Sequence, residues 1–176
     1  LQGDTLWVGL DIGVSLYRIS NEEVKETFRN LGSAIPQDEA VNSILISDTH
    51  ILAGTDKGAA IASLTTTNLL DPANWTNLNS ELPGQSVTSF AQLDETVFIG
   101  TSGGLVQWDD GAVSIISQTA VLDISVHGSL LYVLHDGFVR EFSNGNFTTM
   151  PDPAIDPAII MAEEGGIWGG GQSGLI

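Results

Sequence analysis

The chain has 176 residues, of which 42% are hydrophobic, 20 are glycine and none is cysteine. This composition fits a folded domain, or part of a larger one, and it excludes disulfides, thiolate metal sites and cysteine nucleophiles. The 22 acidic residues outnumber the five basic ones and give a formal charge of −17, which argues against nucleic acid and anionic membranes as partners.

The chain begins LQGDTLWVG, without an initiator methionine or a charged-then-apolar leader, so we expect a processed chain or a piece of a longer one. No apolar run reaches the roughly 18 residues that a membrane span requires. We therefore expect no membrane insertion.

Five similar segments follow one another along the chain. They are LWVGLDIGVSLY (6–17), ILAGTDKGAAIA (51–62), VFIGTSGGLVQW (97–108), LYVLHDGFVREF (131–142) and IWGGGQSGLI (167–176). Their first equivalent positions are Gly9, Gly54, Gly100, Leu134 and Gly170, which are 34 to 46 residues apart. A second glycine follows at Gly13, Gly58, Gly104, Gly137 and Gly174, one position early in the fourth segment. Recurrence at this period indicates a repeat protein.

Short β-branched segments lie between these repeats. We expect strands before them at 40–47, 86–93, 120–127 and 157–163, and after them at 24–30, 74–79, 113–117 and 146–150. Only 65–75 has room for a helical turn. Each repeat then contains four strands, which we name a, b, c and d in chain order, with the first glycine on b.

Four short strands in 34 to 46 residues are typical of a β-propeller blade. A β-sandwich also has short strands, but it has no reason to repeat one turn five times. We therefore predict an all-β propeller of four-stranded antiparallel blades, with 1–176 as a single partial propeller. The blades are expected at 1–30, 40–79, 86–117, 120–150 and 157–176. The end blades would supply strands b–c–d and a–b–c, which overlap, so we expect an incomplete ring.

The segments LWVGLDIGVSLYRIS and VFIGTSGGLVQWDDG resemble the repeat of two-component-regulator propellers. The stretch from GAAIAS through NWTNLNSELPG to VFIGT is also similar to Asp-box-like repeats of secreted bacterial propellers. The chain departs from these patterns where no glycine precedes Trp75 and where the fourth repeat lacks Gly-Thr. The resemblance implies a sensor or interaction module, extracellular or periplasmic in bacteria, and implies no reaction.

Several residues invite a chemical interpretation that the pattern does not support. The glycines at 100–104 lead into a strand rather than a helix, so we interpret them as a b–c turn and not as a phosphate loop. Trp7, Trp108 and Trp168 are expected in the core, and Trp75 against strand d. The three histidines share no ligand spacing, and His135 is expected in an exposed turn. We predict no cofactor and no metal.

The b–c turns and d–a loops of a four-stranded meander project from one edge of each blade. Candidate binding residues on this rim are Asp11, Asp56, Lys57, Ser102, His135, Asp136, Gln172 and Ser173. The rim also carries acidic loop residues such as Glu81, and it could bind a cation or a basic partner. Solvated turn carboxylates explain the same residues, because aspartate favours turns.

The sequence therefore favours a non-catalytic recognition or scaffolding module of a larger exported bacterial protein or complex. Its partner would be another protein or the remaining part of the propeller. Two alternatives stay open: a carbohydrate-active hydrolase or lyase with paired carboxylates at the channel, and a glycan-binding lectin with an exposed Trp75.

Overall fold

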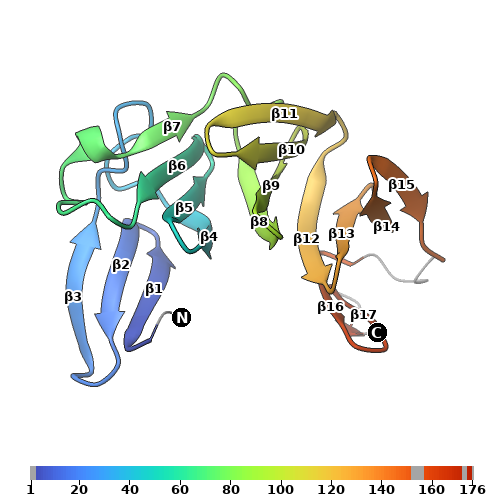
Figure 1. Ribbon diagram of the computed structural model, residues 1–176, viewed down its shortest axis with the longest axis horizontal. Coiled ribbons are helices and arrows are strands. Elements are labelled where there is room, and N and C mark those ends of the chain that lie inside the picture. Colours follow the sequence, from blue (N-terminus) through green and yellow to red (C-terminus); the bar gives the residue numbers. More distant parts are fainter. Residues whose placement is uncertain (1–2, 152–156, 172–173, 176) are drawn as a thin grey trace. The chain divides into compact units, whose positions relative to one another are not determined.

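The computed structural model describes residues 3–151, 157–171 and 174–175. These residues form five separate antiparallel sheets of three or four strands each. Within each sheet the hydrogen-bonded order of the strands follows the sequence (Figure 1). The protein is therefore all-β and built of antiparallel blades, as predicted.

The chain divides into two compact units. The first comprises residues up to Glu81 together with 85–87 and contains two sheets. One sheet has strands β1 (Thr5–Leu10), β2 (Gly13–Arg18) and β3 (Glu23–Phe28). The other has β4 (Val41–Ile46), β5 (His50–Thr55), β6 (Gly58–Ser63) and β7 (Thr76–Leu78). A single 3₁₀ turn, η1 (Pro72–Asn74), lies where the sequence left room for a helical turn.

The second unit comprises Leu82–Gly84 and the chain from Thr88 onward, and it contains three sheets. The first has β8 (Val87–Leu93), β9 (Thr96–Thr101), β10 (Gly104–Asp109) and β11 (Ala112–Ser117). The second has β12 (Val121–His127), β13 (Leu130–His135), β14 (Phe138–Ser143) and β15 (Asn146–Thr149). The third has β16 (Ile159–Glu163), β17 (Gly166–Gly171) and β18 (Gly174–Leu175).

Strand β13 illustrates why the sequence produces stacked sheets. Successive side chains of a strand point to opposite faces. Leu131 and Val133 therefore join the core shared with β8–β11. Tyr132 and Leu134 pack on the other face, in the core shared with β16–β18. A strand buried on both faces has to be apolar at consecutive positions, as LLYVL is.

The core of the first unit lies between its two sheets. Trp75 is 5% exposed and packs with Phe28, their ring centroids 6.4 Å apart. Trp7, which is half-buried, also stacks with Phe28, with a centroid distance of 5.7 Å. The predicted packing role of Trp75 is confirmed, and its burial removes the feature on which the lectin interpretation rested.

The other two tryptophans differ from each other. Trp108 is 7% exposed, as expected for a core residue. Trp168 is 44% exposed, so the prediction that it lies in the core is wrong.

The first glycine of the repeat allows neighbouring sheets to approach closely. A Cβ on Gly9 would lie 2.9 Å from the Val41 carbonyl oxygen, in the first strand of the next sheet. A Cβ on Gly100 would lie 2.8 Å from Cγ1 of Val121, again in the first strand of the next sheet. Glycine is therefore required here by space rather than by backbone conformation.

The second glycine marks the b–c turn, and the fourth turn departs from the others. Gly13 and Gly58 have positive φ and lie just after the two turn residues. In the fourth sheet, His135 pairs with Phe138, so Phe138 occupies that place. Gly137 is instead a turn residue, and with Asp136 it has positive φ, as a type I′ turn requires. The repeat has therefore not lost a residue; the glycine has moved within the turn.

Candidate binding rim

The rim is defined here as the b–c turns together with the d–a segments that contact them. Asp56 lies in the turn between β5 and β6 and is exposed. Its Oδ1 accepts hydrogen bonds from Asn42 Nδ2 and from Ser86 Oγ, both at 2.8 Å. These bonds, that from Ser86 first, hold the pKa of the Asp56 carboxyl below its usual value. Asp56 is therefore a fixed, ionised carboxylate at neutral pH.

Two asparagines fasten the rim of the first unit. Asn77 donates to the Leu31 carbonyl at 2.7 Å and accepts from the Ala34 N–H at 3.0 Å. Asn79 Nδ2 donates to the carbonyls of Lys57 and Ala34. The b–c turn that carries Asp56 is thus tied to the d–a segments on both sides of it, which makes this part of the rim a preorganised surface.

A buried threonine closes two of the turns in the same way. Thr55 Oγ1 donates to the Gly58 carbonyl at 3.0 Å and accepts from the Lys57 N–H. Thr101 Oγ1 donates to the Gly104 carbonyl at 2.9 Å and accepts from the Gly103 N–H. The Gly-Thr pair of the repeat therefore holds the turn residues outward, with Lys57 and Ser102 exposed.

In the second unit, the d–a segment at Pro83–Gly84 lies directly against a b–c turn. A Cβ on Gly84 would lie 2.3 Å from the backbone nitrogen of Gly103 and 2.7 Å from Ser102 Oγ. Ser102 is therefore presented at the same place in its sheet as Asp56 in the first unit.

His135 does not lie in an exposed turn, contrary to the prediction. It ends β13 at the position that Thr55 and Thr101 occupy in their sheets, and it is 2% exposed. Its ring packs edge-on against Phe147 at 5.4 Å, and neither ring nitrogen has a partner among the described residues. Burial is the main cause that lowers the pKa of His135, followed by the charge of Arg140. His135 therefore supports the turn from below and cannot reach a partner at the surface.

The remaining candidates are placed as follows. Asp11 and Asp136 are exposed turn residues, in the first and fourth sheets. Gln172 and Ser173 lie outside the described residues. Of the acidic loop residues, Glu81 accepts from the Asn79 N–H, and Asp38 pairs with Arg29 at 2.5 Å.

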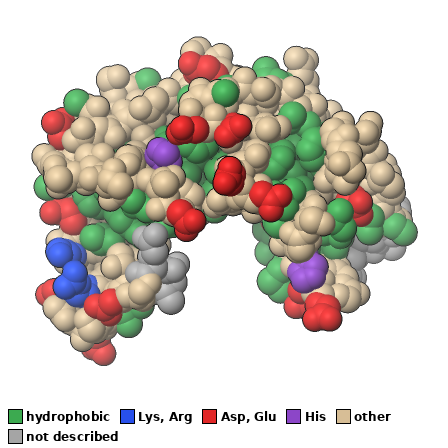
Figure 2. Space-filling model, in the orientation of Figure 1, with side chains coloured by type: hydrophobic (Ala, Val, Ile, Leu, Met, Phe, Trp, Pro, Cys, Tyr) green, Lys and Arg blue, Asp and Glu red, His purple; other side chains and the backbone are tan. Residues whose placement is uncertain are grey.

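Acidic side chains greatly outnumber basic side chains on the described surface. On the face shown in Figure 2, Lys and Arg side chains appear only over the β1–β3 sheet, whereas Asp and Glu are spread widely. No three His, Asp or Glu side chains among the described residues come together as a metal site would require. Within the same residues, no helix is long and apolar enough to cross a membrane. Carboxylates therefore dominate the charge of the face shown in Figure 2.

Sequence reasoning missed the residues that fix the rim. Asn42, Asn77, Asn79 and Ser86 were not singled out, because each acts on a loop that is distant in sequence. The sequence did contain a signal for two of them. Asn42 lies at the start of one strand and Asn77 within another, and asparagine is uncommon in strands, so its presence there indicates a specific hydrogen bond.

No family model matches this chain, and no curated protein matches it. Solved structures do resemble it over nearly its whole length. The extracellular domain of BT4673 from B. thetaiotaomicron superposes with a TM-score of 0.76 and 15% identity, over 99% of this chain and 25% of that one. PorZ, an essential bacterial surface component of the type-IX secretion system of Porphyromonas gingivalis, gives 0.69 and 18%, over 99% and 23%.

YCF48, a β-propeller solved with a bound D1 peptide, gives a TM-score of 0.63 and 14% identity, over 94% of this chain and 56% of that one. The chain thus spans about a quarter of the length of the first two structures and about half of the third. These similarities identify the β-propeller fold.

Proposed function

We propose that this propeller is a non-catalytic recognition or scaffolding module of a larger exported bacterial protein or complex. It binds a protein partner through the rim of b–c turns and d–a loops. The partner contributes hydrogen-bond donors, from backbone N–H groups or from Lys and Arg side chains.

The arrangement of Asp56 is the observation that carries this proposal. Both donors to Asp56 use Oδ1, and no described residue donates to Oδ2. The carboxylate is ionised, exposed and held in one orientation, and Lys57 lies beside it. A partner donor would meet an acceptor that loses little conformational freedom on binding, which favours affinity.

The similar structures support the proposal at a coarser level. BT4673 and PorZ are described as an extracellular domain and a bacterial surface component, and YCF48 binds a peptide. An exported, partner-binding propeller is consistent with all three.

Peptide selection followed by substitution tests the proposal. Random peptides displayed on phage are selected on the immobilised 176-residue chain, and the enriched peptides are synthesised and titrated by calorimetry. Asp56→Asn removes the charge while it keeps a side chain of equal size, and we expect it to weaken binding about tenfold, since a hydrogen bond to a charged group contributes roughly 1.5–3 kcal/mol.

Asp48→Asn is the matched control, because Asp48 is exposed in the turn at the other end of β5. It makes the same change in charge on the same sheet, so its affinity should equal that of the unsubstituted chain. Equal weakening by both variants would indicate non-specific attraction to an acidic protein and would refute a binding role for the rim.

A further inference from the structure

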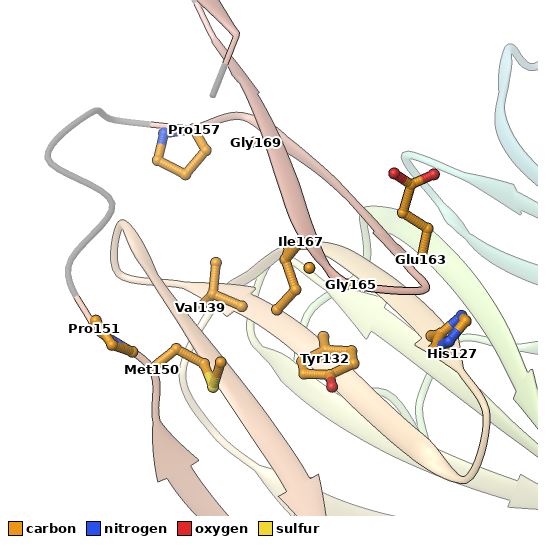
Figure 3. A pocket seen from close by; sticks show the side chains of 11 residues that line it. His127, Tyr132, Val139, Met150, Pro151, Pro157, Glu163, Gly165, Ile167 and Gly169 are labelled. Atoms are coloured by element: carbon orange, nitrogen blue, oxygen red, sulfur yellow. The ribbon is translucent and has the colours of Figure 1, made fainter.

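A second surface feature lies between β13–β14 and β17 in the second unit, and one of its ends borders the d–a segment that follows β15. It is a cavity of about 560 Å³, open on one side, within the range usual for ligand sites. Figure 3 shows Tyr132, Val139 and Ile167 along its wall, with Met150 and Pro151 at one end and His127 and Glu163 at the other.

The apolar wall is a continuation of a packed core. Tyr132, Met150 and Ile167 are half-buried and pack against the cluster of Leu134, Val139 and Ile160. Their positions are therefore fixed by the two sheets, and an apolar group that enters the cavity would contact a wall that is already in place. Burial of such a group is favourable by roughly 25 cal/mol per Å².

Glu163 gives one end of the cavity a fixed negative charge. It ends β16, and its Oε1 accepts a hydrogen bond from Trp168 Nε1, which orients the carboxylate. Gly165 in the turn that follows, and Gly166 at the start of β17, have no side chains and leave this end open.

No Lys or Arg is among the described residues that line the cavity, and His127 lies at the same end as Glu163. Arg140 is the only Lys or Arg after Lys57 in the sequence. It directly follows Val139 on β14, and alternation directs its side chain to the other face of the sheet. An apolar wall beside a carboxylate, with no Lys or Arg among the described lining residues, favours ligands that are both apolar and cationic.

We propose that this cavity binds a short basic-hydrophobic peptide segment of a partner protein. An aromatic or large aliphatic side chain of the peptide enters between Tyr132 and Ile167, and a flanking Lys or Arg pairs with Glu163. The Glu163 end of this site lies at the a–b turn, at the opposite end of the strands from the b–c turns, and the proposal does not depend on the function proposed for the rim.

The test uses the isotope-labelled 176-residue chain and the peptide acetyl-Gly-Lys-Phe-Lys-Gly-amide. We expect saturable shifts of the methyl resonances of Val139, Met150 and Ile167 in NMR titration. The same peptide with Ala for Phe should bind at least tenfold more weakly, because the buried ring is lost. The peptide with Glu for both Lys should also bind more weakly, because its charges oppose Glu163.

Two substitutions and two controls complete the test. Glu163→Gln should weaken the Lys-Phe-Lys peptide about two- to fivefold, as for an exposed ion pair. Gly166→Phe should weaken it by occupying the open end; a Cβ there meets nothing within 4 Å, so folding should be kept. Glu164→Gln, which removes the neighbouring charge outside the cavity, and Asp48→Asn, in the exposed turn before β5, should leave the affinity unchanged.

Three results would overturn the proposal. The first is a set of shifts spread over the acidic surface, with Glu164→Gln as damaging as Glu163→Gln. The second is equal binding of the peptide with Ala for Phe. The third is that benzylammonium binds at these residues as tightly as the peptide, which would make the ligand a small amphiphilic cation.

Discussion

At the fourth b–c turn, a histidine occupies the place of a threonine. Thr55 and Thr101 each bond to the turn backbone through Oγ1. His135 lies at the same position with neither ring nitrogen partnered among the described residues, against Phe147. A protonated imidazole would be poorly accommodated there, because its charge would be buried near the cation of Arg140.

This environment makes the stability of the protein depend on pH. The pKa of His135 is lowered in the folded state below its ordinary value of 6.5, so the unfolded chain binds the proton more readily. Stability should therefore fall as the pH drops through about 6.5, and stop falling on this account below the folded-state pKa. His135→Thr should remove this loss, measured as a smaller drop in the urea midpoint between pH 7.5 and 5.5.

His127→Thr supplies the comparison, since His127 is exposed. That variant should keep the full pH dependence of the unsubstituted chain. If the urea midpoint of His135→Thr falls between pH 7.5 and 5.5 as much as that of His127→Thr, the buried imidazole is not the group responsible.

Residue-scale prediction from the sequence succeeded where a backbone requirement dictates the residue. The second glycine of the repeat is an example: Gly13 and Gly58 directly follow the b–c turn, and both have positive φ. Prediction failed at His135, because alignment on the second glycine placed the fourth b–c turn one position too early. His135 is the last residue of β13 and is buried, whereas the sequence placed it in the exposed turn.

At the scale of elements, polar side chains on the first strand of one sheet join it to the first strand of the next sheet. Asp123 on β12 accepts from the N–H of Ile160 on β16 at 2.8 Å and from its neighbour Ile124 at 2.9 Å. Two residues along β12, Ser125 Oγ accepts from the Ala162 N–H at 2.8 Å. Burial raises the pKa of Asp123 although both hydrogen bonds oppose the rise. These contacts set the register between the two sheets.

Removal of the Asp123 carboxylate should loosen this junction. Asp123→Ala leaves two backbone donors without an acceptor, and we expect the free energy of unfolding to fall by about 1–3 kcal/mol. Ser125→Ala leaves one such donor and should cost about 1 kcal/mol. Urea denaturation measures both values, and hydrogen exchange at the Ile160 amide should accelerate in Asp123→Ala.

Exchange at the Leu131 amide, in the neighbouring strand, provides an internal reference for global unfolding. Faster exchange at Ile160 alone would locate the effect at the junction. An unchanged rate at Ile160 in Asp123→Ala would contradict a structural role for this carboxylate.

The strands were predictable from the sequence because each strand and the turn that follows it are determined by residues that are close together in the chain. The order of strands within each sheet followed from turn spacing. The contact between Asp123 and Ile160 joins residues 37 positions apart, and no local pattern announces it. The cavity beside Tyr132 was unpredictable for the same reason, since two stacked sheets create it.

At the scale of the whole molecule, charge is the dominant property. The formal charge of −17 is distributed over a chain with only five basic residues, and the two ion pairs among the described residues are exposed, Arg18–Asp4 and Arg29–Asp38. A high net charge keeps a β-rich protein soluble, but repulsion between its carboxylates also destabilises the compact folded state. Composition alone revealed this property, because it does not depend on which residues meet.

Added salt should therefore stabilise the protein. Between 10 and 150 mM NaCl, the screening length falls from roughly 30 to 8 Å, so repulsion between separated carboxylates is reduced. We expect a gain of about 1 kcal/mol, which for a chain of this size raises the unfolding midpoint by about 2–4 °C. Calorimetric scans in NaCl and KCl should agree, because screening depends on ionic strength and not on the cation.

A charge-reduced variant separates screening from other effects of salt. Asp109 and Asp110 are exposed, and Asp110 lies in the turn between β10 and β11. Changing both to Asn should raise the midpoint at 10 mM salt and reduce its further rise at 150 mM. A midpoint that does not respond to salt in either protein would mean that repulsion contributes little to stability, and that acidity serves only solubility and the selection of basic partners.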